Sequence, residues 1–179
     1  MSSPSFIVLR TFAGAHHLEK TVPYERSELA KIGAELRVAQ CTSADQVVAA
    51  GHDADAIIHP TNVPLSARTL AQLSRCKGIV VTKVGADNVD VAAATARGII
   101  VANLPDGWTN EVADQTMGLI LAVNRQIVRL DHDLRARGWA AVWSSPPVMP
   151  ALRFMTLGLV GFGRIARAVA VRARTFGLT

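Results

Sequence analysis

Short apolar runs alternate with amphipathic segments through the first part of the chain. The runs have the length of buried strands and cover residues 6–9, 35–39, 56–59, 78–83 and 99–103. The segments between them have helical spacing of apolar residues and cover residues 25–32, 44–50, 66–74 and 91–97. Parallel strands need long crossover connections, so this alternation predicts an α/β fold whose parallel sheet carries helices on both faces.

Polar residues mark where several of these helices begin. Ser43, Ser66 and Asp90 each stand just before a helical segment, where a side-chain oxygen can accept from a free backbone amide. Gly98 follows the fourth segment and is a suitable helix stop. These signals favour a sheet of the flavodoxin-like type over residues 1–108.

The pattern changes after residue 108. Apolar residues at helical spacing predict one long helix from about Asn110 to Arg137, and the prolines Pro146, Pro147 and Pro150 cannot continue it. We therefore interpret residues 109–150 as a long interdomain helix with a proline-rich linker. Residues 151–179 are the start of a second domain.

A glycine loop stands near the end of the chain. A predicted strand, Thr156 to Val160, runs into Gly161-Phe162-Gly163-Arg164-Ile165-Ala166 and then into an Ala- and Arg-rich helix that ends near Phe176. A purely structural interpretation is a glycine turn between a strand and a helix. Because strand and helix are both in place, the G-x-G-x-x-A pattern favours a dinucleotide pyrophosphate at the helix start, as in a Rossmann domain.

Charge and composition exclude several classes. The formal net charge is +5, but residues 151–179 hold five arginines and no acid, so the excess belongs to that segment alone. No aromatic stacking platform accompanies these arginines, which argues against nucleic acid. Two cysteines are too few for a disulfide scaffold and no apolar run could span a membrane, so we expect a cytoplasmic protein. His16, His17 and Glu19 lack further ligands at metal-binding spacing, and we assign no metal.

Five ordered motifs resemble the D-isomer-specific 2-hydroxyacid dehydrogenase family, which includes phosphoglycerate dehydrogenases and the dehydrogenase-like C-terminal-binding co-repressors. They are Gly85-Ala86-Asp87-Asn88-Val89-Asp90, Gly98-Ile99-Ile100-Val101-Ala102-Asn103-Leu104-Pro105, Glu111-Val112-Ala113-Asp114, Arg137-Gly138-Trp139 and the glycine loop. The resemblance runs from about residue 56 to residue 179. Before residue 56 only the pattern of elements is similar.

The resemblance implies a substrate site on the loop after the fourth strand. The backbone amides of Val84 and Gly85 would bind the substrate carboxylate, and His59 is a further candidate contact. Asp87 and Asn88 would shape the turn. The family usually has glycine where Lys83 stands, and a histidine where Gln115 follows Asp114. Lys83 adds positive charge beside an acidic substrate or is simply solvated, and the sequence leaves both alternatives open.

The resemblance also implies NAD as the cofactor. Contacts are expected from the loop Gly161, Phe162, Gly163, Arg164 and Ile165, and from Val112 on the long helix. The acidic residue that would hold the adenine ribose should lie about 20 residues beyond the loop, so the residues present do not distinguish NAD from NADP.

Two functions are open at this stage. The first is an NAD-dependent oxidoreductase that transfers hydride between NAD(H) and a 2-hydroxy or 2-oxo acid. The family's catalytic histidine, acid and arginine match no residue here, so we assign no catalytic residue and expect an incomplete Rossmann domain in a partial chain that is inactive by itself. The alternative is a non-enzymatic binding module similar to the co-repressors. Members of the family usually dimerise through the nucleotide domain, so the resemblance also implies a homodimer.

Overall fold

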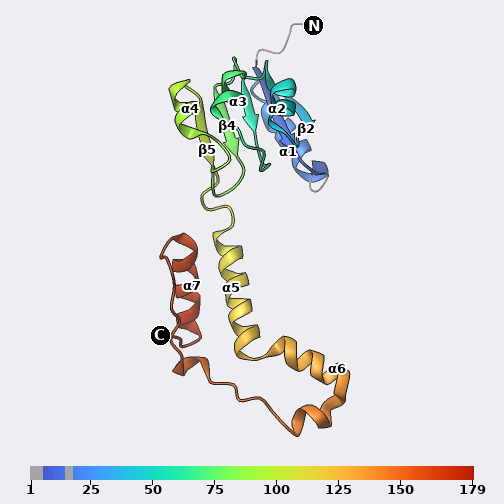
Figure 1. Ribbon diagram of the computed structural model, residues 1–179, viewed down its shortest axis with the longest axis vertical. Helices are drawn as coiled ribbons and strands as arrows, with labels where there is room; N and C mark the ends of the chain where they lie inside the picture. The colour runs from blue at the N-terminus through green and yellow to red at the C-terminus, as the bar shows by residue number, and fades with distance from the viewer. Residues whose placement is uncertain (1–5, 15–17) are drawn as a thin grey trace. The chain divides into compact units, whose positions relative to one another are not determined.

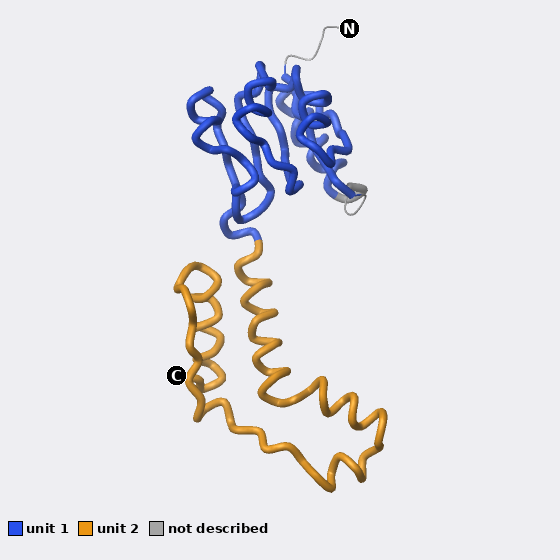
Figure 2. The backbone as a smooth tube through the Cα atoms, viewed as in Figure 1, with its two compact units in different colours: residues 1–107 blue, residues 108–179 orange. Residues whose placement is uncertain are grey.

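The structure, a computed structural model, describes residues 6–14 and 18–179, with side chains from residue 21 onward in the second range. It divides into two compact units, residues 1–107 and 108–179 (Figure 2), and each is described by itself. The three-part domain division expected from the sequence stays a prediction.

The first unit is built on one parallel sheet (Figure 1). Its strands are β1 (Phe6–Phe12), β2 (Ala34–Gln40), β3 (Ala56–Ile58), β4 (Gly78–Val81) and β5 (Ile100–Asn103). They are ordered β2-β1-β3-β4-β5, and every neighbouring pair is parallel. This is the flavodoxin-like order, so the predicted α/β fold is confirmed.

Helices cover both faces of the sheet. They are α1 (Leu18–Ala30), α2 (Ala44–Gly51), α3 (Ala67–Ala71) and α4 (Val91–Ala96). Successive residues of β1 point to opposite faces, as a strand requires: Leu9 joins a core cluster with Val47 of α2, while Val8 joins another with Leu29 of α1. β1 is therefore buried on both sides, whereas Val80 of β4 and Ile100 of β5 are exposed.

The predicted helix starts are confirmed. The side chains of Ser43, Ser66 and Asp90 accept hydrogen bonds from the backbone amides of Gln46, Thr69 and Ala93 respectively. Gly98 has a φ of 71°, a left-handed conformation that ends α4 and that glycine adopts without steric cost.

Two elements of the first unit are longer than the sequence indicated. β1 continues through Arg10 and Thr11, which are polar but buried. Arg10 forms an ion pair with Glu25 at 2.9 Å, and Thr11 bonds the ring of His59, so tertiary partners compensate their burial. Helix α1 begins at Leu18, ahead of the predicted start at Glu25, and carries Pro23 inside it.

The prediction of one long helix from Asn110 to Arg137 is wrong. The second unit has two helices there, α5 (Thr109–Asn124) and α6 (Ile127–Trp143), and a break between them. Gln126 has a φ of 51°, and a left-handed residue cannot continue a right-handed helix. α6 is itself kinked at Gly138, whose φ is 76° and ψ 170°.

The predicted strand from Thr156 to Val160 is also not a strand. This segment follows a short 3-10 helix, η1 (Leu152–Phe154), and precedes α7 (Arg164–Thr175). Leu157 donates to the carbonyl of Thr179 at 2.8 Å, and the amide of Thr179 donates to Met155 at 3.2 Å. A strand needs a continuous ladder, and among the described residues only Thr179 pairs with this segment through its backbone.

No helix in the described part of the chain is both long enough and apolar enough to cross a membrane.

Asp55 stands before β3 and ties three strands together. Its carboxylate accepts from the amide of Ile7 at 2.9 Å and from the guanidinium of Arg75 at 3.0 Å, while its carbonyl accepts from the amide of Lys77. The backbone amide hydrogen bond and Arg75 hold the pKa of Asp55 below the usual aspartate value.

Replacing Asp55 with asparagine should lower the free energy of unfolding by about 1–3 kcal/mol, because a buried charge-assisted acceptor is lost. Urea titration at neutral pH measures this. Since the folded-state pKa is lowered, the contribution of Asp55 is present above the usual aspartate pKa and is lost as the pH falls through the folded value.

Asp53→Asn is the matched control, since Asp53 pairs with Arg37 at the surface. Asp53→Asn should lower the free energy of unfolding by less than Asp55→Asn does. Equal losses from the two variants would contradict the role assigned to Asp55.

Candidate functional site

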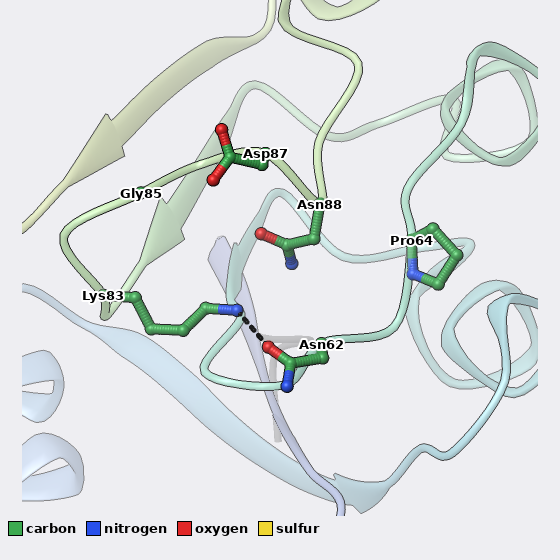
Figure 3. A pocket seen from close by; sticks show the side chains of 6 residues that line it. All are labelled: Asn62, Pro64, Lys83, Gly85, Asp87 and Asn88. Carbon is green, nitrogen blue, oxygen red and sulfur yellow. Dashed lines mark hydrogen bonds between the residues drawn. The ribbon is translucent and has the colours of Figure 1, made fainter.

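The loops that leave the carboxyl ends of β3 and β4 border an open hollow of about 530 Å³. Ligand sites of open parallel sheets form beyond the carboxyl ends of their strands. Figure 3 shows the residues that line this hollow, which are Asn62, Pro64, Lys83, Gly85, Asp87 and Asn88.

One carbonyl joins the two loops. The oxygen of Thr61 accepts a hydrogen bond from Nζ of Lys83 at 3.0 Å and another from Nδ2 of Asn88 at 3.0 Å. Lys83 also donates to Oδ1 of Asn62 at 2.7 Å (Figure 3). The loop after β4 is therefore held against the loop after β3 by side chains at both of its ends.

Further hydrogen bonds hold the two ends of the loop after β4. Leu65 donates to the carbonyl of Asn88 at 2.7 Å. On the side of β5, the amide of Leu104 donates to the carbonyl of Lys83 at 3.0 Å, and Nδ2 of Asn103 donates to the carbonyl of Val84 at 2.6 Å. The substrate loop expected from the sequence is thus a rigid part of the unit.

Gly85 lies close to the side chain of Asp87. A Cβ atom at Gly85 would lie 2.7 Å from Oδ2 of Asp87, so a larger residue would have to displace that carboxylate. Within the described residues, no hydrogen bond engages the amide of Val84 or Gly85. Free amides at a strand end suit an anion, so this geometry supports the two residues as carboxylate contacts.

His59 directly follows β3 and is fully buried. Its Nε2 is 2.9 Å from the carbonyl of Val63, which can only accept, so Nε2 carries the proton. Its Nδ1 is then the acceptor for the hydroxyl of Thr11 at 2.9 Å. With no exposed atom, His59 supports the loop after β3, and this placement does not favour the direct substrate contact predicted for it.

Burial lowers the pKa of His59, and the nearby charge of Lys83 lowers it further. The unfolded chain therefore binds a proton at His59 more readily than the folded chain. The free energy of unfolding should be highest above pH 6.5, the ordinary histidine value, and should fall as the pH drops below it.

Urea unfolding between pH 7.5 and about pH 5 measures this slope. His59→Gln should be less stable than the wild type at pH 7.5 but should show a flatter pH profile, because the titrating group is gone. His52→Gln, at an exposed site after α2, should keep the wild-type slope. An unchanged slope in His59→Gln would rule out this histidine as its source.

The structure gives Lys83 a defined position in place of a solvated one. Its ammonium group bonds two neutral oxygens at the edge of the hollow. Among the described residues, no carboxylate lies within ion-pairing distance of it.

The glycine loop lies in the second unit and ends at α7. Gly161 has a φ of 82°, which favours glycine, and Gly163 is the N-cap of α7. No atom lies within 4 Å of a Cβ built on Gly163, so packing in this chain does not explain its lack of a side chain. Arg167 donates to the carbonyl of Phe162 at 3.1 Å and lies over its ring.

α7 is held against α5. Ala113 and Met117 of α5 pack with Val169 and Ala173 of α7 in one buried cluster. The guanidinium of Arg172 bonds Asp114 at 2.6 Å and Asn110 at 3.2 Å. This contact holds the last turn of α7 against α5, and sequence reasoning missed it because the partners are about 60 residues apart in the chain.

The other predicted cofactor residues differ in how exposed they are. Ile165 is partly buried against the α5–α7 cluster, whereas Phe162 and Val112 are exposed. Arg164 is the first residue of α7, where backbone amides have no intrahelical partner. The open space at Gly163 and these amides fit a pyrophosphate, so the loop can accept a dinucleotide.

The described residues contain no group of three or more histidine, cysteine or acidic side chains that could hold a metal. His16 and His17 lie outside the described residues, as does the side chain of Glu19.

Comparison with known proteins agrees with this geometry. The family described as D-isomer specific 2-hydroxyacid dehydrogenase, catalytic domain, matches residues 16–176. D-3-phosphoglycerate dehydrogenase of Mycobacterium leprae is 36% identical over 155 residues, 85% of this chain. Glyoxylate reductase of Korarchaeum cryptofilum is 37% identical over 128 residues, 70% of this chain.

Solved structures show the same fold. The TT0316 protein from Thermus thermophilus is 30% identical and matches 97% of this chain with a TM-score of 0.74. D-lactate dehydrogenase from Aquifex aeolicus, solved with NAD and lactic acid, matches 96% of this chain with a TM-score of 0.78 and shares the fold at 24% identity.

The chain spans part of each relative. It covers 29% of the Mycobacterium leprae protein, 38% of the Korarchaeum cryptofilum protein and 54% of the Thermus thermophilus chain.

Proposed function

The chain belongs to the D-isomer-specific 2-hydroxyacid dehydrogenase family, and we propose that it serves hydride transfer between NAD(H) and a 2-hydroxy or 2-oxo acid. The observation that carries this proposal is the rigid loop whose Val84 and Gly85 amides are free beside a hollow. The glycine loop before α7 supports it independently.

The first unit would bind the acid. The carboxylate of a 2-hydroxy or 2-oxo acid would accept from the amides of Val84 and Gly85, which need no rearrangement because both loop ends are tied down. Such preorganised donors bind an anion without the entropic cost of ordering a loop.

The second unit would bind the dinucleotide. Gly161 makes the turn, Gly163 leaves room for the pyrophosphate, and the first amides of α7 face it. NAD, when bound, supplies the hydride acceptor or donor of the reaction. The glycine loop does not distinguish NAD from NADP, so NAD is proposed from the family and NADP stays open.

Proton transfer needs a group that reaches the substrate, and none of the described histidines is suited to it. His59 is fully buried with both ring nitrogens bonded, and His52 is exposed at the end of α2. His132 lies exposed on α6, with its Nδ1 3.7 Å from the carboxylate of the adjacent Asp133. A general acid or base must lie within hydrogen-bonding reach of the reacting atom, so we assign no catalytic residue.

The 179-residue chain alone should therefore bind a 2-oxo acid but should not catalyse its reduction by NADH. NADH absorbance should stay constant with a panel of 2-oxo acids, while the acids shift the Val84 and Gly85 amide resonances in NMR spectra. NADH oxidation that requires this chain and an acid would refute the assignment of no catalytic residue. Failure of every acid to shift the two amides would refute the substrate site.

Gly163→Ala tests the dinucleotide site. Its methyl group has space within the chain, so stability should change by less than about 1 kcal/mol, but it occupies the approach of the pyrophosphate. NADH affinity, measured by fluorescence titration, should fall at least about fivefold, equivalent to about 1 kcal/mol.

Gly158→Ala is the matched control, since Gly158 also has open space and lies outside the loop. It should keep wild-type NADH affinity. Equal affinities of Gly163→Ala and the wild type would contradict the proposed pyrophosphate contact.

The non-enzymatic alternative, a co-repressor-like binding module, gains no specific support from the described residues. A homodimer and a cytoplasmic location also stay proposals. The two buried free thiols, Cys41 and Cys76, support a reducing compartment.

A further inference from the structure

We propose that Lys83 makes the hollow selective for 2-hydroxy or 2-oxo acids that carry a second anionic group, either a carboxylate or a phosphate. The proposal rests on the proposed function, because the first carboxylate is taken to bind Val84 and Gly85. It adds a charge-selecting side chain in the same hollow.

The ammonium group of Lys83 has an unused donor. A lysine ammonium carries three N–H groups, and two of them bond the oxygens of Thr61 and Asn62. Both partners are neutral, so the positive charge is not compensated by either of them. The third N–H can bind an anionic oxygen without breaking an existing hydrogen bond.

The position of Lys83 favours a second contact in addition to the amides. Figure 3 shows the ammonium beside Asn62, while the carboxylate of Asp87 lies toward Gly85 on the other side of Asn88. No ion pair joins Lys83 to Asp87, among the residues whose side chains are described. Lys83 and the free amides thus present donors to the same hollow from two places.

The lysine side chain is already ordered before any ligand binds. A lysine side chain that is free in solvent loses rotamer freedom when it binds an anion, and this entropic cost reduces the favourable free energy of binding. Here Thr61 and Asn62 hold the ammonium in place, so most of that cost is met in the folded chain. A second anionic group would therefore gain more affinity than it would from a solvated lysine.

A purely structural role for Lys83 makes a different prediction. If the side chain only joins the two loops, its removal should affect all acids equally. If it selects charge, removal should weaken binding of acids with two anionic groups more than binding of acids with one.

The experiment uses the 179-residue chain and two matched pairs of acids, with affinities measured from NMR shifts of the Gly85 amide. One pair is 2-oxopentanoate and 2-oxoglutarate, which have equal carbon chains but one and two carboxylates. The other is D-glycerate and D-3-phosphoglycerate, which tests phosphate as the second group. The proteins are wild type, Lys83→Met, Lys83→Arg and Lys77→Met.

Lys77→Met is the charge-matched control, because Lys77 precedes β4 at the opposite edge of the sheet and is exposed. The wild type should bind the doubly anionic member of at least one pair about three- to tenfold more tightly. Lys83→Met should lose that preference, and any affinity that it loses because the loop is held less firmly should be lost equally by both members of a pair. Lys83→Arg should retain part of the preference, and Lys77→Met all of it.

The outcomes separate the two proposals. If both members of each pair shift Gly85 with equal affinity, or if Lys83→Met keeps the preference, charge selection by Lys83 is wrong and the substrate site stands. If no acid shifts Gly85, the proposed function and this inference both fail. A preference that weakens as salt is added would further support an electrostatic origin.

Discussion

Parallel strand pairing is the constraint on which the first unit depends. Each parallel neighbour must be reached through a crossover, so every strand of the sheet ends at the same edge. The loops after β3 and β4 meet there because these strands are neighbours, although about 20 residues separate them in the chain. The hollow is a consequence of this topology together with the side chains that the loops carry.

The carbonyl of Thr61 fixes the position of the loop after β4 relative to the loop after β3. It accepts from both Lys83 and Asn88, so a single backbone oxygen holds both ends of the neighbouring loop. His59, two residues before Thr61, bridges the hydroxyl of Thr11 and the carbonyl of Val63. Buried polar groups of this kind are stable only when paired, and their pairing makes the hollow rigid.

In the second unit the glycine loop is positioned by a helix that lies far from it in the chain. Apolar side chains of α5 and α7 share one buried cluster, and Arg172 bonds Asp114 and Asn110 of α5. The position of α7, whose first turn is the proposed pyrophosphate site, therefore depends on packing against α5, to which Ile165 near its start and Arg172 in its last turn both contribute. Asp114 contributes by holding Arg172 in the last turn of α7.

The sequence alone determined the features that follow local rules. The order of strands and helices, the caps at Ser43, Ser66 and Asp90 and the glycine at residue 98 arise from hydrophobic spacing and backbone geometry, which a linear pattern records. The family motifs also placed the candidate loops. Only the tertiary structure decided where polar side chains have partners: Arg10 and Thr11 lie in a strand, His59 is buried, and Lys83 reaches Thr61 and Asn62. It also decided that Gln126 breaks the long helix and that residues 156–160 lack a ladder, because both depend on what each segment packs against or pairs with.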